Sequence, residues 1–290
     1  MRSLPALCLI FLIAISSNAI AQEKVQFASR DGDGSSPPTQ LDGYLFRPPD
    51  AVGTFPAVVF LHGCGGLISS VSHRIMSREM DWAGKLNDKG IGVLMVDSLT
   101  PRGSGEICSR SGFKEWLYRR RPADAYGALV YLQALSFVQH DRIGLVGWSN
   151  GGGATLFAVG TQSRARPAAP AGPDFAAAVA FYPGSCNEQR LGSDWTTSIP
   201  LLVLIGELDV WTPAAPCRQV VDRAAARGAP VEIHAYPGAY HDFDWPGAKH
   251  RELVAYTTRA GVVPIVGEDP AAHADAIRRV EAFFTSHLLH

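Results

Sequence analysis

Short uninterrupted apolar runs, bounded by turn residues, recur along the chain and predict buried β-strands. The clearest run is 56–61, Pro-Ala-Val-Val-Phe-Leu, which leads into a glycine-rich segment. Continuous runs of this kind are typical of strands that are buried on both faces of a sheet. The predicted strands cover residues 25–28, 41–46, 56–61, 91–96, 142–147, 176–181, 200–205 and 231–236.

Segments with helical spacing of apolar residues lie between many of these strands. Within 72–89, for example, Ile75, Trp82 and Leu86 are apolar and Gly90 provides a stop. The alternation of strands and helices predicts an α/β fold, with a mostly parallel, doubly wound sheet and helices on both faces. In such a sheet the functional residues lie on loops at the carboxyl ends of the strands. The predicted helices cover residues 72–89, 122–135, which starts at a proline, 151–159, 214–227 and 271–288.

The first 21 residues predict a removable secretory signal. Arg2 is the only charged residue before Glu23, residues 7–15 are uninterruptedly apolar, and residues 19–21 form a small-x-small cleavage site. The alternative is an uncleaved anchor, but the apolar run is shorter than the ~20 residues that span a bilayer. We therefore expect cleavage after Ala21. A single domain at 22–290 would then be periplasmic or secreted, without stable membrane insertion.

Composition and charge exclude several classes of protein. The chain has 290 residues, of which 47% are hydrophobic and 18% charged, and these proportions exclude a disordered protein. Its 26 basic and 27 acidic residues give a net charge of -1, which argues against nucleic acid as a partner. No period of about 20–50 residues repeats, so a solenoid or propeller is not expected.

Four cysteines remain after loss of the signal, which contains Cys8. An even number in an oxidising compartment predicts disulfides. We expect one bond between Cys64 and Cys108, which follow neighbouring strands, and one between Cys186 and Cys217. Zinc binding is the alternative, but no C-x-x-C or H-x-x-x-H spacing supports it, so no metal site is predicted.

The segment 147–151 reads Gly-Trp-Ser-Asn-Gly and carries the strongest chemical signal in the chain. This G-x-S-x-G pattern stands between a buried strand and a glycine-rich helix start, which is the context of a nucleophile elbow. A sharp strand-to-helix turn exposes the hydroxyl of Ser149 at a helix N-terminus, where a developing negative charge is favoured. Ser149 is therefore the predicted nucleophile, and an incidental Gly/Ser turn is the alternative.

A serine hydroxyl needs a base to take its proton and a carboxylate to orient that base. His241 follows the last predicted strand of the sheet and is the predicted base, because its loop opens at the same edge as Ser149. Asp209 follows the strand at 200–205 and is the predicted acid, in the Ser–Asp–His order that this fold uses. The alternative acids are Glu207, Asp194, Asp242 and Asp244.

An oxyanion hole needs two N–H donors, of which one comes from the residue after the nucleophile. That residue is Asn150, and the glycine-rich loop after the strand at 56–61 supplies the second donor. Cys64 is the expected residue, with Gly63 and Gly65 as its neighbours. His62 precedes the serine and is expected to brace this loop; a role for the thiol of Cys64 as nucleophile is a further alternative.

Together these segments resemble the dienelactone hydrolase family of α/β-hydrolases. The resemblance lies in LHGCGG (61–66), GWSNGG (147–152), GELDVWTP (206–213) and YPGAYHDF (236–243), and it extends from about Leu41 to the last helix. It implies a largely lidless hydrolase of esters or lactones that needs no cofactor. The nucleophile, acid and base of the family map onto Ser149, Asp209 and His241. Dienelactone-cleaving members carry cysteine at the nucleophile, whereas this chain has serine, so a more general esterase is expected.

The expected reaction is acyl transfer to water through an acyl-enzyme, with a small-molecule ester as substrate. A thioesterase or peptidase on the same three residues is the nearer alternative, and a non-catalytic secreted binding protein is the more distant one. Residues 119–121 are three consecutive arginines before a predicted helix. They are interpreted as a solvated basic turn, with contact to an acidic substrate as the alternative. The sequence does not indicate the oligomeric state.

Overall fold

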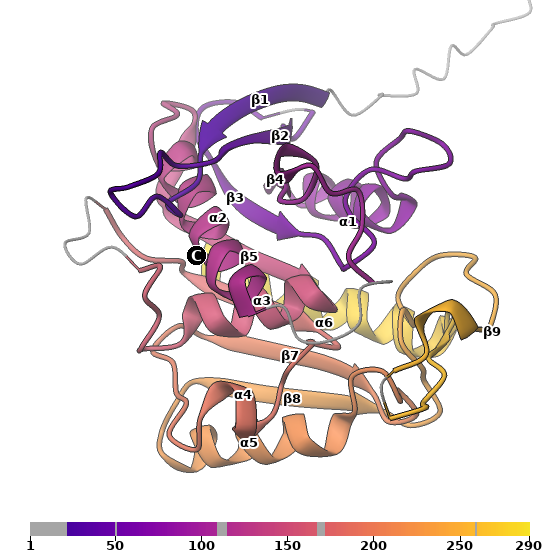
Figure 1. Ribbon diagram of the computed structural model, residues 1–290. Helices are drawn as coiled ribbons and strands as arrows, with labels where there is room; N and C mark the ends of the chain where they lie inside the picture. The colour runs from indigo at the N-terminus through magenta and orange to yellow at the C-terminus, as the bar shows by residue number, and fades with distance from the viewer. Residues whose placement is uncertain (1–21, 50, 109–114, 167–171, 259) are drawn as a thin grey trace, which may run out of the picture.

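The structure is a computed structural model that describes residues 22–49, 51–108, 115–166, 172–258 and 260–290. The predicted signal at 1–21 lies outside these residues. The main sheet has eight strands in the order β1-β2-β4-β3-β5-β6-β7-β8 (Figure 1). They are β1 (Gln22–Ala28), β2 (Gln40–Phe46), β3 (Phe55–Leu61), β4 (Gly92–Asp97), β5 (Val138–Trp148), β6 (Ala177–Phe181), β7 (Leu201–Gly206) and β8 (Val231–Tyr236).

The sheet is parallel from β4 to β8, and β1 and β2 extend it as an antiparallel pair. Every residue of β3, β4, β6 and β7 is buried, as the continuous apolar runs predict. Helices cover both faces (Figure 1), so the predicted mostly parallel α/β architecture is confirmed. The helices are α1 (Ser77–Asp88), α2 (Glu115–Gln133), α3 (Asn150–Val159), α4 (Glu188–Leu191), α5 (Ala214–Ala226) and α6 (Pro270–Leu288).

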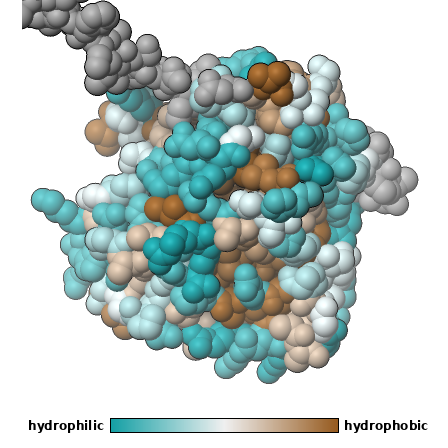
Figure 2. Space-filling model, turned by 180° about the vertical axis from the view of Figure 1, so that it is seen from behind, coloured by the Kyte–Doolittle hydropathy of each residue, from teal (hydrophilic) through white to brown (hydrophobic). Residues whose placement is uncertain are grey.

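α2 and α3 pack against each other on one face, while α1 and α6 adjoin on the other. The ring of Trp82 in α1 lies 6.2 Å from the ring of His273 in α6, and Lys89 at the end of α1 pairs with Glu281 of α6. From behind, the surface is largely hydrophilic with smaller apolar patches (Figure 2). Exposed apolar side chains such as Val52 and Val71 are common on soluble proteins and by themselves indicate no partner.

Two helix starts differ from the sequence prediction. α1 begins at Ser77 rather than at residue 72, because the preceding residues fold into a small hairpin in which Ile68 bridges Ile75. α2 begins at Glu115 rather than at Pro122, which lies inside the helix. A proline is most often found in the first turn, since it has no N–H to donate. Here the helix continues on both sides of it.

Between the site and α6 the chain makes an excursion that the apolar pattern does not predict. It contains β9 (Arg251–Glu252), the 3-10 turn η2 (Val254–Tyr256) and β10 (Ile265–Val266). β9 and β10 form a separate two-stranded sheet, and Val266 bridges to His241. The excursion is therefore attached directly to the backbone of the predicted base.

Candidate active site

β5 passes into α3 through a sharp turn centred on Ser149. Ser149 has φ 54° and ψ -113°, a conformation that is rare for a residue with a side chain. Its N–H donates to the carbonyl of Phe181 at 3.0 Å, and its own carbonyl accepts from Gly184 at 2.7 Å. Hydrogen bonds to the neighbouring β6 loop thus hold the strained turn in place.

The two outer glycines of the G-x-S-x-G segment are required by close packing. A Cβ on Gly147 would lie 2.2 Å from the carbonyl oxygen of Gly151, and one on Gly151 would lie 2.0 Å from that of Leu61. Real Cβ atoms do not approach so closely. The segment therefore forms the nucleophile elbow that its spacing predicts.

The structure brings the three predicted catalytic side chains into one hydrogen-bonded chain. The Nε2 atom of His241 lies 3.0 Å from the Oγ atom of Ser149, and its Nδ1 atom lies 2.6 Å from the Oδ2 atom of Asp209. His241 and Asp209 are buried, and Ser149 is 8% exposed. This is the arrangement in which a histidine can accept the serine proton while a carboxylate fixes its ring.

Asp209 is held by the turn that follows β7. Its Oδ1 atom accepts from the backbone N–H groups of Trp211 and Thr212, both at 2.8 Å, and its Oδ2 atom accepts from the Thr212 hydroxyl at 2.7 Å. These bonds leave the carboxylate aimed at His241. Thr212 also lies 3.2 Å from the Nδ1 atom of His241, a contact that the sequence analysis did not single out.

The charge of His241 is subject to opposing effects. Burial lowers its pKa, but the charge and hydrogen bond of Asp209, with a smaller contribution from Asp242, raise it. The net direction is upward from the ordinary value of 6.5. The rings of Tyr182 and Trp211 lie 4.4 and 5.0 Å from the imidazole, so aromatic groups pack around the base.

The alternative acids are all engaged elsewhere. Asp244 is fully buried and accepts from the ring N–H groups of Trp82 and Trp148 and from the Tyr182 hydroxyl. The other three, Glu207, Asp194 and Asp242, contact Arg218, Gln162 and Arg78 respectively. Asp209 is the carboxylate that contacts the Nδ1 atom of His241.

Arg78 links Tyr182, which follows β6, to Asp242, which follows His241. Its Nη1 atom donates to the Tyr182 hydroxyl at 3.0 Å and to Asp242 at 2.9 Å, and its Nη2 atom donates to Glu79 at 2.6 Å. Burial raises the pKa of Tyr182 well above its ordinary value, so the hydroxyl stays protonated and can donate to Asp244. Sequence reasoning missed this network because its members are far apart in the chain.

The loop after β3 is fixed by His62, as predicted. The Nδ1 atom of His62 lies 2.6 Å from the carbonyl oxygen of Gly63, and its Nε2 atom accepts from the N–H of Ser98. Burial, followed by the charge of Arg121, lowers the pKa of His62 well below 6.5. The ring is therefore neutral, and it does not contact Ser149 but supports the loop.

Both predicted disulfides are present. Cys64 is bonded to Cys108, and Cys186 to Cys217, with Cα–Cα distances of 5.0 and 4.7 Å. The first bond ties the loop after β3 to the segment after β4, and the Cys64 carbonyl also accepts from Ile107. Because its sulfur is bonded, Cys64 does not have the free thiol that a nucleophile needs.

The arginine cluster at 119–121 needs a correction. Its residues lie within α2 rather than before a helix, and Arg121 is fully buried rather than solvated. Arg121 donates to the side-chain oxygen of Asn150 and to the backbone carbonyl of His62. Burying a guanidinium is costly unless it is hydrogen-bonded, as Arg121 is here. Three consecutive arginines in a sequence do not indicate that one of them is buried.

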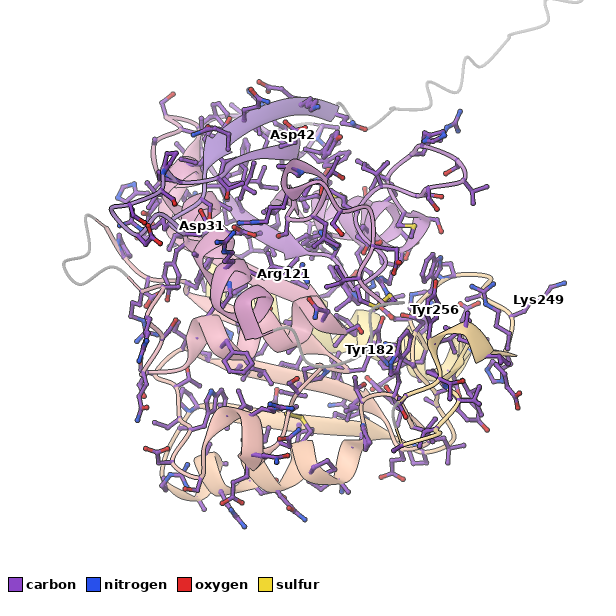
Figure 3. The ribbon with its side chains drawn as sticks, viewed as in Figure 1. Asp31, Asp42, Arg121, Tyr182, Lys249 and Tyr256 are labelled. Carbon is purple, nitrogen blue, oxygen red and sulfur yellow. A yellow bond between two sulfur atoms is a disulfide. The ribbon has the colours of Figure 1, made fainter. Side chains whose placement is uncertain are left out.

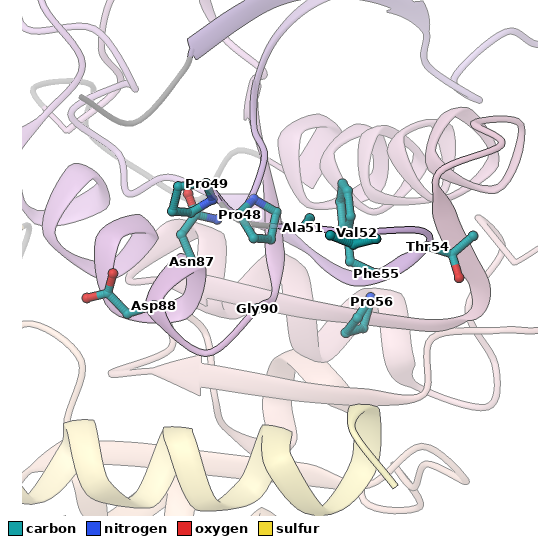
Figure 4. A pocket seen from close by; sticks show the side chains of 10 residues that line it. All are labelled: Pro48, Pro49, Ala51, Val52, Thr54, Phe55, Pro56, Asn87, Asp88 and Gly90. Atoms are coloured by element: carbon teal, nitrogen blue, oxygen red, sulfur yellow. The ribbon is translucent and has the colours of Figure 1, made fainter. Parts of the chain in front are cut away.

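A cavity elsewhere in the molecule is not a candidate site. It measures about 410 Å³ and lies where β3 begins and α1 ends (Figure 4). Ser149, in contrast, follows the carboxyl end of β5. Its lining is mainly proline and apolar, and Asp88 is its one charged residue. Across the described ranges there is no grouping of three or more His, Cys, Asp or Glu side chains that could hold a metal ion.

The fold and the elbow together define an α/β-hydrolase. The sequence matches the model of the Dienelactone hydrolase family over residues 41–288, and the chain belongs to that family. The match covers most of the chain, including the elbow, the turn of Asp209 and the loop of His241.

Individual relatives share limited sequence identity with this chain. YtaP of Bacillus subtilis (strain 168), to which a hydrolase function is ascribed, is 32% identical over 123 residues, which are 38% of this chain and 40% of YtaP. The dienelactone hydrolase-like promiscuous phosphotriesterase P91 from metagenomic libraries has a TM-score of 0.64 at 20% identity, over 93% of this chain and 99% of P91. The dienelactone hydrolase of Anabaena variabilis ATCC 29413 has a TM-score of 0.57 at 20% identity, over 91% and 99%. At such identities the structures establish a shared fold.

Proposed function

We propose that this protein is a serine hydrolase that cleaves carboxylic esters or lactones through an acyl-enzyme on Ser149. The observation that carries the proposal is the continuous hydrogen-bonded chain from Ser149 through His241 to Asp209 at a nucleophile elbow. Membership of a hydrolase family supports it. The substrate is a small molecule with an acyl group, and the chemistry needs no cofactor.

In this reaction His241 takes the proton of Ser149 as the hydroxyl attacks the substrate carbonyl. The backbone N–H groups of Asn150 and Cys64 stabilise the oxyanion that forms. His241 then gives its proton to the leaving alcohol. A water molecule, deprotonated by the same histidine, attacks the acyl-enzyme and releases the acid and Ser149.

Labelling with a fluorophosphonate probe tests the nucleophile. The folded wild-type protein should be labelled, and the Ser149→Ala variant should not. A folded but unlabelled wild type would exclude the serine hydrolase, and labelling that persists in Ser149→Ala would place the nucleophile elsewhere. A panel of matched ester, lactone, thioester and amide substrates then distinguishes an esterase from a thioesterase or peptidase.

We further propose that the protein is exported and that its signal is cleaved after Ala21. Two disulfides support this location, because such bonds persist in oxidising compartments and are rare in the cytosol. No helix among the described residues is long and apolar enough to cross a membrane.

A further inference from the structure

Arg121 lies between the two segments that carry the proposed oxyanion donors. Its Nη1 atom donates to the Oδ1 atom of Asn150 at 2.5 Å, and its Nη2 atom donates to the carbonyl oxygen of His62 at 2.7 Å. Asn150 begins α3, and His62 stands at the end of β3. Figure 3 labels Arg121 in the interior of the molecule, beside the helices at the front of the sheet. One buried side chain thus contacts both halves of the proposed hole.

The bond to His62 fixes backbone that leads directly to Cys64. The carbonyl of His62 and the N–H of Gly63 belong to one planar peptide, and the carbonyl of Gly63 and the N–H of Cys64 belong to the next. Arg121 holds the first of these carbonyls, and the His62 ring holds the second at 2.6 Å. A trans peptide points its N–H away from its carbonyl, so these bonds together set the direction of the Cys64 N–H.

The bond to Asn150 reaches the residue that carries the other donor, through its side-chain oxygen. Asn150 occupies the first position of α3, and its side chain is partly exposed, so without a partner it could rotate freely. Its contact with Arg121 couples the start of α3 to the loop after β3. The planar fork of a guanidinium offers two parallel donors at a fixed spacing, which an ammonium group does not.

We infer that Arg121 is a positioning residue for the oxyanion hole, holding the N–H groups of Asn150 and Cys64 at the separation at which both reach one oxygen. The inference rests on the proposed function. Arg121 acts through its neighbours and not on the substrate, so it should affect the transition state more than substrate binding.

The test compares Arg121→Gln and Arg121→Lys with the wild type on an activated ester. We expect kcat to fall about 10- to 100-fold in Arg121→Gln, less than the loss of a whole donor, with KM within about twofold. Arg121→Lys keeps the charge and one donor and should recover part of kcat. A trifluoromethyl ketone, which binds as an oxyanion adduct, should lose affinity in proportion to the fall in kcat.

Arg166→Gln is the matched control for stability. Arg166 is partly buried, whereas Arg121 is fully buried. Arg166 donates to Tyr126 and to the carbonyl of Val159, which is at the opposite end of α3 from Ser149. At an equal loss of melting temperature, Arg166→Gln should keep the wild-type kcat. If both variants lose activity equally, or if Arg121→Gln raises KM and leaves kcat unchanged, the inference is wrong.

Asn150→Ala keeps the test decisive if the Arg121 variants do not fold. It removes the acceptor of one bond but keeps the backbone N–H, so kcat should fall with KM nearly unchanged. Where the double variant folds, its loss should be smaller than the product of the single losses, because the two share a bond. An unchanged kcat in Asn150→Ala would overturn the inference. A wild type that is not labelled on Ser149 would instead refute the proposed function.

Discussion

His241 shows how a buried residue can be kept ready to exchange a proton. Burial alone would make the charged ring unfavourable and favour the neutral imidazole. The carboxylate of Asp209 at 2.6 Å has the opposite effect and prevails. The imidazolium that forms during the reaction is therefore stabilised where it arises.

This balance predicts the pH dependence of activity. A general base must be neutral, so kcat/KM should rise with pH and reach half its maximum above 6.5, the ordinary histidine value from which the pKa of His241 is raised. In Asp209→Asn the carboxylate no longer raises the pKa of His241 while burial still lowers it, so the rise of kcat/KM with pH should occur at lower pH. The maximal kcat/KM should fall by about 10³- to 10⁴-fold.

The measurement is kcat/KM from about pH 5 to about pH 9 for both proteins, with circular dichroism as a control for folding. A wild-type limb that lies below the ordinary histidine value would contradict the prediction. So would a limb that stays in place in Asp209→Asn.

A second residue-scale prediction concerns Gly151. Its added Cβ would collide with the carbonyl of Leu61, which is backbone of β3 and cannot move without disturbing the sheet. We expect Gly151→Ala to lower the free energy of unfolding by about 3 kcal/mol or more and to abolish labelling of Ser149. Gly105→Ala is the control, because a Cβ at Gly105 meets nothing within 4 Å. Equal denaturation midpoints for the two variants would count against this explanation of the elbow.

At the scale of elements, the strands and the order of the site residues could be predicted because each depends on a short stretch of sequence. Apolar runs mark buried strands, and Ser149, Asp209 and His241 each stand just past one of them. The start of α2 could not be predicted, because Pro122 is a strong local signal for a first turn. The helix nevertheless continues through Pro122, and α2 as a whole packs against α3 and β5.

The buried polar groups were inaccessible to sequence reasoning for a different reason. Arg78 meets Asp242 across 164 positions of the chain, and Arg121 meets His62 across 59. No signal in the surrounding sequence distinguishes a buried arginine from a solvated one, because its partners become neighbours only when the sheet assembles. Three consecutive arginines therefore suggest solvent exposure, although Arg121 is fully buried.

The two disulfides connect different pairs of elements, and this predicts different consequences of removing them. Each closes a loop, with separations of 44 and 31 residues, so loss of either should lower the free energy of unfolding by about 3–4 kcal/mol. Cys64 carries a proposed oxyanion donor, whereas Cys186 and Cys217 join the loop after β6 to α5. The variant Cys64→Ser/Cys108→Ser should therefore also lose kcat below its melting temperature.

The comparison is made at a temperature where both double variants remain folded by circular dichroism. Cys186→Ser/Cys217→Ser should then keep the wild-type kcat. Equal kcat values for the two double variants would show that the bond at Cys64 contributes to stability alone.

At the scale of the whole molecule, the two disulfides fit the proposed export, because such bonds persist in oxidising compartments. Cys64–Cys108 and Cys186–Cys217 account for the four cysteines that would remain after cleavage following Ala21.

Expression with the native leader in a Gram-negative host tests this proposal. The protein should be recovered from the periplasm or medium, and its intact mass should correspond to a chain that starts at Gln22. All four remaining cysteines should resist alkylation until a reductant is added. Recovery of the full-length chain with reactive thiols in the cytosol would refute export.

The carboxylate of Asp244 has an optical consequence. It accepts hydrogen bonds from the indoles of both Trp82 and Trp148, at 2.8 and 2.7 Å, in a fully buried setting. Trp148 is the residue immediately before Ser149, so its emission reports on the surroundings of its indole at the elbow. One of the six tryptophans of the chain is therefore a fluorophore at the elbow, through which repacking there can be followed without a label.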